Sequence, residues 1–303
     1  MKNKKKASSD LSISILFLTP ILVLILCITI IPIIIAFRTS MHATNYAAVG
    51  KFIGLTNYIS ILTSKEGWST ILNSISYVLS SLIIVMPLGV ITGTLLNRKI
   101  KGIGALRTMI IIPWVISQTV AALLWKWLLN GNYGPVFYTI YNLTGVKVDF
   151  FNSAISAKLT VVLANVWNSF PVVVILTLAA LQTVSRDVYE AAKVDGANGL
   201  TIYTRITLPL IKPTLTTAVV MQSMEYFNMV TLIYVLTAGG PLGATETISV
   251  KAFRQAFDFW HLGTGSAYSV IIFLLNIVFS LFYIKMMSSP KDALAKPAKV
   301  KGR

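Results

Sequence analysis

The stretch that decides the fold runs from Gln182 to Pro213 and reads QTVSRDVYEAAKVDGANGLTIYTRITLPLIKP. Ser185 can cap the start of a helix, Asp187 complements its positive end, and the residues that follow are mostly good helix formers. Gly196 supplies a residue with positive φ, which ends this helix and lets a second short one begin. We therefore expect a helix–turn–helix elbow within a loop at 182–212, although composition alone would also fit an ordinary connection between helices.

The segments outside this loop are long and apolar. Only 12% of the 303 residues are charged, against about 25% in soluble domains, which excludes a conventional soluble protein. Six charge-poor windows approach or exceed the roughly 20 residues that a membrane-crossing helix needs; they are 11–37, 71–97, 108–125, 159–185, 213–237 and 262–284. We predict an all-α, polytopic integral membrane protein with six transmembrane helices across 11–287, a basic N-terminus at 1–10 and a basic tail at 288–303.

The basic residues predict the topology. Of the 26 Lys and Arg residues, 18 lie in four segments, namely the N-terminus, 98–107, 186–212 and the tail from Lys285. The positive-inside rule places these segments, and so both termini, in the cytoplasm. The net charge of +16 thus indicates a multi-pass protein of a bacterial cytoplasmic membrane, with lipid and not nucleic acid as its anionic neighbour. The first apolar run is too long for the core of a signal peptide, so we expect it to be retained.

Several kinds of site are not expected. Cys27 is the only cysteine, and the two histidines are 219 residues apart, which leaves no disulfide and no zinc site to predict. No Gly-x-x-x-x-Gly-Lys-Ser/Thr motif is present, so the chain has no P-loop for ATP phosphates. Motifs for an intramembrane enzyme are also missing, and we expect no catalytic residues, no metal and no cofactor bound by this chain.

Three motifs resemble the permease subunits of carbohydrate ABC importers. Glu190-Ala-Ala-x-x-Asp-Gly-Ala, followed by Ile206-Thr-Leu-Pro, is similar to their EAA loop. Phe52-Ile-Gly-Leu-Thr-Asn-Tyr and Thr237-Ala-Gly-Gly-Pro resemble two further segments of the maltose/glycerol-phosphate-type permeases. The resemblance implies a type I ABC importer permease fold, sugar transport, and four kinds of neighbour: a second homologous permease, two ATPase subunits that carry ATP and Mg²⁺, an external solute-binding protein, and lipid.

The resemblance also implies roles for residues of the loop. Glu190 would pair with a basic residue of the ATPase, Ala191 and Ala192 would allow close packing, and Gly196 would set the turn. Asp195 belongs to the same motif. These residues would convert closure of the ATPase pair into movement of the transmembrane helices.

Polar residues mark a candidate substrate pathway, because polar groups inside a bilayer usually face a pathway or a neighbouring helix. Helical spacing places them on one face of the fourth span and one face of the fifth; they are Asn165, Asn168, Ser169 and Val172, then Gln222, Glu225 and Tyr226. The resemblance favours sugar contacts, with changed residue types at most of these positions. Any single residue fits helix–helix packing equally well.

Glu225 is a carboxylate within an otherwise uncharged span, and it allows three interpretations. It could bond sugar hydroxyls, pair with a basic residue of the partner permease, or be protonated. The alternative function is a self-contained, proton-coupled secondary sugar carrier that uses Glu225, but such carriers usually have more spans, built from paired repeats.

Prolines and glycines in the second and third spans predict bent and closely packed helices. They are Pro87, Gly89, Gly93 and Pro113.

Overall fold

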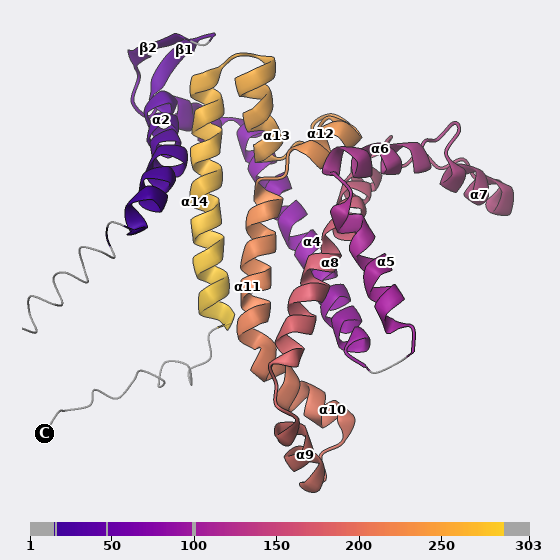
Figure 1. Cartoon of the computed structure of the whole chain (residues 1–303). Coiled ribbons are helices and arrows are strands. Elements are labelled where there is room, and N and C mark those ends of the chain that lie inside the picture. Colours follow the sequence, from indigo (N-terminus) through magenta and orange to yellow (C-terminus); the bar gives the residue numbers. More distant parts are fainter. Residues whose placement is uncertain (1–14, 16, 47, 99–100, 288–303) are drawn as a thin grey trace, which may run out of the picture. The chain divides into compact units, whose positions relative to one another are not determined.

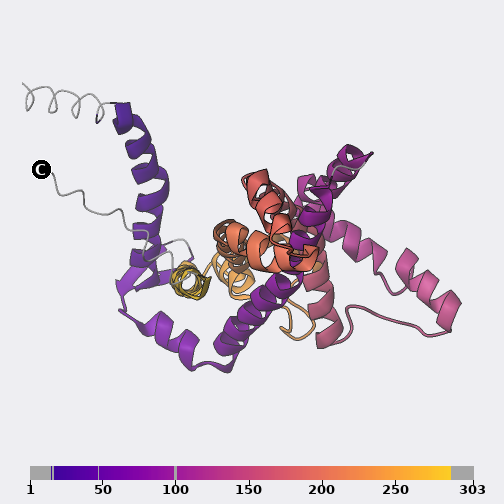
Figure 2. The ribbon, with the colours of Figure 1, turned by 90° about the horizontal axis from the view of Figure 1, so that it is seen from below.

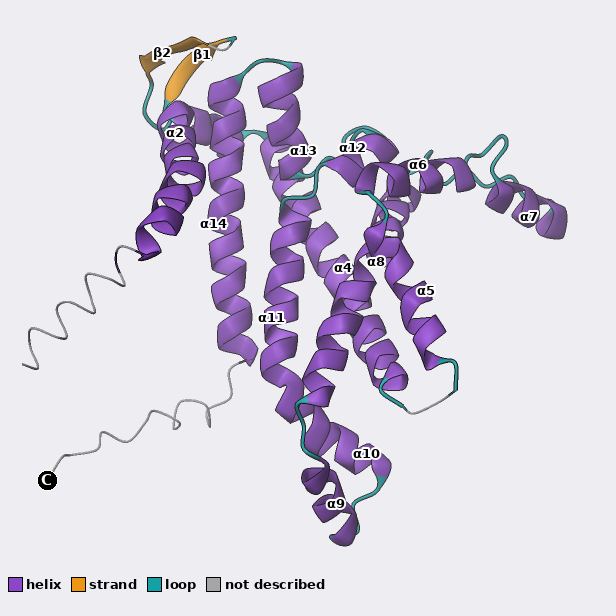
Figure 3. Ribbon diagram, in the orientation of Figure 1, coloured by secondary structure: helices purple, strands orange, loops and turns teal. Residues whose placement is uncertain are grey.

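The structure is a computed structural model that describes residues 15, 17–46, 48–98 and 101–287. It divides into two compact units. The first lies within Met1–Ser64 and Lys251–Ile271, and the second within Lys65–Val250 and Ile272–Arg303. Helices dominate both (Figure 3), so the predicted all-α class is confirmed.

In the first unit, one helix runs from Phe17 to Ser40. It contains a π-helical turn, η1 (Leu26–Ile30), followed by α2 (Ile31–Ser40). A two-stranded antiparallel hairpin follows, β1 (His42–Asn45) and β2 (Ala48–Phe52), and then α3 (Thr56–Thr63). The hairpin is an element that the sequence patterns did not predict. Residues 11–14 of the predicted first span lie outside the described residues.

The Phe-Ile-Gly-Leu-Thr-Asn-Tyr motif fixes the end of α2. The Asn57 amide donates to the backbone carbonyl of Ser40 at 2.8 Å, and the Tyr58 hydroxyl lies 2.5 Å from the Ser40 hydroxyl. The bond from Asn57 satisfies a carbonyl at the helix C-terminus that has no partner within the helix. The motif is therefore a local structural device that joins α2 to α3.

The second unit is a helical bundle (Figure 1). From Lys65 onward the helices are, in chain order, α4 (Lys65–Leu96), α5 (Ile103–Val115), α6 (Gln118–Leu128), α7 (Pro135–Thr144), α8 (Ala154–Gln182), α9 (Arg186–Val194), α10 (Gly199–Ile202), the π-helical turn η2 (Tyr203–Thr207), α11 (Leu208–Phe227), α12 (Thr231–Thr237), α13 (Ile248–Phe253), the π-helical turn η3 (Arg254–Asp258) and α14 (Leu262–Met287). The last part of α13, η3 and the first part of α14 belong to the first unit.

Glycines bring α4 and α8 close together. A Cβ at Gly89 would lie 2.5 Å from the Cβ of Val173, and one at Gly93 would lie 2.8 Å from the Cβ of Thr177. The two positions are one turn apart on α4, so the helices touch along a stripe of small residues. This confirms the predicted close packing, and α4 continues unbroken through Pro87.

The third and fifth predicted spans are broken. The break in the third span follows Pro113 and confirms the bend predicted there, whereas no bend was predicted in the fifth. α5 and α6 meet at 95°. The helical stretch Gly199–Phe227, which ends with α11, meets α12 at 48°. Four described helices are long and apolar enough to cross a membrane singly, and the two bent pairs raise the total to as many as six. The second halves of the broken spans, α6 and α12, pack against each other, with the Lys126 ammonium 3.3 Å from the Val235 carbonyl oxygen.

Candidate functional site

The elbow predicted from the sequence is present, as α9 followed by α10. The amide of Ala197 donates to the carbonyl of Ala192 at 2.9 Å, and that of Gly196 donates to Lys193 at 3.0 Å. This pair of bonds is the Schellman arrangement, which requires a left-handed residue, and Gly196 has a φ of 76°. The Asn198 side chain then accepts from the amide of Thr201 at 2.8 Å and starts α10.

The acidic residues of the elbow face outward. Glu190, Ala191, Asp195 and Gly196 are exposed, and neither carboxylate forms an ion pair with any residue that the structure describes. A Cβ at Gly196 would meet no atom within 4 Å. The elbow therefore presents an open surface that another protein could bind.

Two details of the elbow differ from the simplest expectation. Ala192 is only 7% exposed, so it packs inside the elbow and leaves Ala191 as the alanine available to a neighbour. Ser185 occupies the cap position of α9, but its side chain accepts no hydrogen bond from the helix. The predicted position of the cap is therefore right but its side-chain hydrogen bond is not formed, and Asp187 is the acidic residue that complements the first turn.

The elbow contacts η2 through a residue to which the motif analysis gave no role. The Thr207 hydroxyl, in η2, lies 3.5 Å from the Tyr189 hydroxyl. Both residues also line an open cavity of about 550 Å³ between the elbow and the end of α4, where Arg98 lies.

Four of the seven predicted pathway residues form one buried cluster between α8 and α11, which lie side by side in both views (Figures 1 and 2). The Ser169 and Tyr226 hydroxyl oxygens are 2.7 Å apart. The Gln222 amide donates to the Tyr226 hydroxyl at 3.1 Å and to the Ser169 carbonyl at 3.3 Å. Asn165 is fully buried, and its amide lies beside the Tyr226 hydroxyl.

Tyr77 of α4 adds to this cluster, and no sequence motif indicated it. Its ring centroid lies 6.1 Å from that of Tyr226, with 59° between the ring planes. Its hydroxyl is buried and finds no partner among the residues that are described. Three helices thus contribute to one polar region inside the bundle.

The other three predicted residues lie elsewhere. The Asn168 amide donates to the Pro113 carbonyl at 2.6 Å, which holds the break between α5 and α6. Val172 is half-buried. Glu225 is exposed and forms no ion pair with a described residue, but its carboxylate lies close enough to Tyr77 and Tyr226 to interact with both electrostatically.

The Thr-Ala-Gly-Gly-Pro segment forms a bonded loop after α12. The Thr237 and Thr245 hydroxyl oxygens are 2.7 Å apart, and the Thr245 hydroxyl donates to the Gly240 carbonyl at 2.8 Å. The Asn73 amide of α4 donates to the Gly243 carbonyl at 3.0 Å. The loop is therefore attached to the bundle at the end of α8 opposite the elbow.

Comparison with known proteins decides the family. Residues 85–284 match the model of the binding-protein-dependent transport system inner membrane component. The chain belongs to this family. As such a permease, it is a multi-pass protein of the inner membrane. The matched region contains the last part of α4, the elbow and the buried cluster, but not Tyr77.

Relatives agree with this assignment along most of their length. The permease is 35% identical over 279 residues to the trehalose/maltose transport system permease MalF of Thermococcus litoralis, covering 91% of this chain and 94% of that one. It is 27% identical to the sn-glycerol-3-phosphate permease UgpA of Agrobacterium fabrum, over 83% and 86% of the two chains. A bacterial ABC transporter that imports the acidic polysaccharide alginate shares the fold, with a TM-score of 0.79 at 22% identity, over 95% and 98% of the chains.

Proposed function

We propose that this permease forms half of the translocation pathway of an ATP-driven importer for a sugar or oligosaccharide, and that the elbow couples it to an ATPase. The observation that carries the proposal is the elbow itself, with an exposed and unpaired Glu190 carboxylate among the described residues. Sugar is the substrate class because relatives named for trehalose, maltose and sulfoquinovosyl glycerol match over about nine-tenths of the chain.

The coupling step follows from the geometry of the elbow. A basic residue of the ATPase would pair with Glu190, while Ala191 allows the two backbones to approach. Truncating one partner of such a buried pair costs about 2–5 kcal/mol, because the other charge is left unpaired. The Schellman turn at Gly196 fixes the angle between α9 and α10, so movement of the ATPase reaches α8 and α11 through a defined connection.

The remaining components follow from this role. A second homologous permease completes the pathway, two ATPase subunits bind ATP and Mg²⁺, and an external solute-binding protein delivers the sugar. The permease itself is then non-catalytic, and ATP hydrolysis occurs on the separate ATPase subunits. The elbow and both termini lie in the cytoplasm, as the 18 basic residues in the four segments that include them favour.

Reconstitution tests the proposal. Proteoliposomes that contain the permease, its partner permease and the ATPase should take up labelled sugar only when the binding protein and ATP are both supplied. Omitting either should stop uptake, and a proton gradient should not replace ATP. Uptake by the purified permease alone, driven by a proton gradient, would contradict the proposal and support a secondary carrier.

A further inference from the structure

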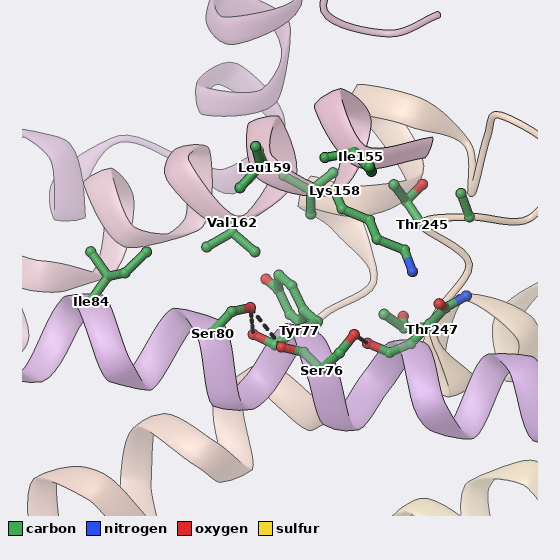
Figure 4. Close-up of a pocket in the computed structure, with 13 residues that line it drawn as sticks. Ser76, Tyr77, Ser80, Ile84, Ile155, Lys158, Leu159, Val162, Thr245 and Thr247 are labelled. Carbon is green, nitrogen blue, oxygen red and sulfur yellow. Dashed lines mark hydrogen bonds between the residues drawn. The ribbon is translucent and has the colours of Figure 1, made fainter. Parts of the chain in front are cut away.

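A second cavity of about 280 Å³ lies between α4, α8 and the loop at 244–247 (Figure 4). Its α4 wall carries Ser76, Tyr77 and Ser80 beside Ile84, and the Ser76 and Ser80 hydroxyls donate to carbonyls of their own helix. Most of the accessible lining is apolar. Its α8 wall is apolar, with Leu159 and Val162, apart from the single charge of Lys158. It lies in the first two to three turns of α8, far along that helix from the elbow.

Lys158 contributes an unused cation to this cavity. Its side chain extends toward the loop that carries Thr245 and Thr247 (Figure 4). Across the described ranges it forms no ion pair and no hydrogen bond. A lysine in this position has three donors that are free for a ligand.

Tyr77 separates the cavity from the buried cluster. It is 6% exposed and lines the cavity, while its ring packs beside that of Tyr226 in the cluster. Its hydroxyl is buried and has no partner in the part of the chain that is described. Buried polar groups without partners are costly and rare, so this hydroxyl, on a ring that lines the cavity, points to a ligand that is not present.

We infer that the cavity is a vestibule of the sugar pathway and that Tyr77 is a substrate-contact residue between it and the Asn165–Tyr226 cluster. A sugar ring has apolar C–H faces and polar hydroxyl edges. The apolar α8 wall and the Tyr77 ring fit the faces, while the Tyr77 hydroxyl and Lys158 fit the edges. The inference rests on the proposed function, and it adds α4 to the helices that contact the substrate.

A lipid acyl chain is the competing occupant, because Ile155 and Leu159 at the edge of the cavity are 74% and 56% exposed. The Tyr77 hydroxyl favours the sugar, since an acyl chain would leave it without a hydrogen-bond partner. A charged thiol reagent distinguishes the two occupants, because a cysteine in a watery pathway ionises and reacts, whereas one in lipid does not.

The experiment uses the assembled transporter with Cys27→Ser, which removes the only native cysteine. Ser80→Cys lines the cavity, and Leu79→Cys is its control, because Leu79 is 39% exposed but does not line it. With binding protein and ATP present, a charged methanethiosulfonate added on the side opposite the elbow should modify Ser80→Cys roughly tenfold faster or more. Equal rates, or faster reaction at Leu79→Cys, would overturn the inference.

A second measurement isolates the hydroxyl of Tyr77. Tyr77→Phe should raise the KM for uptake of labelled maltose or trehalose about tenfold, through loss of one hydrogen bond to the sugar. The control is Tyr283→Phe, which removes another buried hydroxyl without a partner among the described residues but lies in α14, and its KM should not change. Equal KM values for the two variants would contradict a substrate contact. If the wild type imports neither sugar, maltose and trehalose are not its substrates, and the thiol measurement still tests the vestibule.

Discussion

The hydroxyl oxygen of Ser169 on α8 lies 2.7 Å from the hydroxyl oxygen of Tyr226 on α11, and both side chains are at most 2% exposed. This contact ties the helix that precedes the elbow to the helix that follows it. The proposed sugar cluster and the proposed coupling loop are therefore joined by the same two helices. A movement imposed on the elbow can change the cluster without any further connecting element.

Removing the Tyr226 hydroxyl should weaken this connection. Tyr226→Phe takes a partner from both Ser169 and Gln222, and interhelical hydrogen bonds in membranes contribute about 0.6–1.7 kcal/mol. We expect lower thermal stability of the purified complex by that amount, together with a higher KM for sugar. Tyr138→Phe, on an exposed side chain of α7, is the control, and a Tyr226→Phe variant that matched it in both measurements would remove the cluster from the pathway.

The close contact of α4 and α8 should not tolerate a methyl group. Gly89→Ala would place its Cβ 2.5 Å from that of Val173, and overpacking typically costs about 1–3 kcal/mol. Gly104→Ala is the matched control, because a Cβ at that helical glycine would have no atom within 4 Å. Thermal unfolding of the two variants should differ, with Gly89→Ala unfolding at lower temperature. Equal unfolding temperatures would mean that the helices are not in contact there.

The break between α5 and α6 should depend on the Asn168 amide. Asn168→Asp replaces the group that donates to the Pro113 carbonyl at 2.6 Å with an acceptor, which leaves that carbonyl unpaired at a cost of about 1–3 kcal/mol. We expect faster proteolysis near Ile116 and reduced stability. Asn142→Asp, at an exposed position of α7, should have neither effect. Identical proteolysis of the two variants would show that Asn168 does not hold the break.

The features that could be predicted from the sequence are those set by local chemistry. The turn at Gly196 follows from a left-handed residue after a helix-forming run, and the contact at Gly89 and Gly93 follows from small residues one turn apart. Helical periodicity also predicted that Ser169 and Tyr226 lie on facing sides of α8 and α11. In each case the decisive signal lies within about one or two turns of helix.

The features that could not be predicted depend on distant contacts. The 95° break after Pro113 is held by Asn168, 55 residues later in the chain. A hydropathy window covers only neighbouring residues, so it contains no information about that bond. Tyr77 joins the cluster only because α4 packs beside α8 and α11. Glu225 falls at the edge of the predicted face, and packing of the neighbouring helices decides that it is exposed.

The central claim is that the elbow transmits ATP hydrolysis to the transmembrane helices. The most direct test is ATP-dependent sugar uptake by the reconstituted transporter carrying Glu190→Lys, compared with Asp149→Lys, which makes the same change in charge at an exposed position outside the elbow. The account predicts that Glu190→Lys assembles in the membrane but takes up sugar roughly 30-fold more slowly or worse, while Asp149→Lys transports normally. Gly196→Pro should act like Glu190→Lys, because proline cannot adopt the φ of 76° found there. Wild-type uptake by an assembled Glu190→Lys transporter would contradict the account.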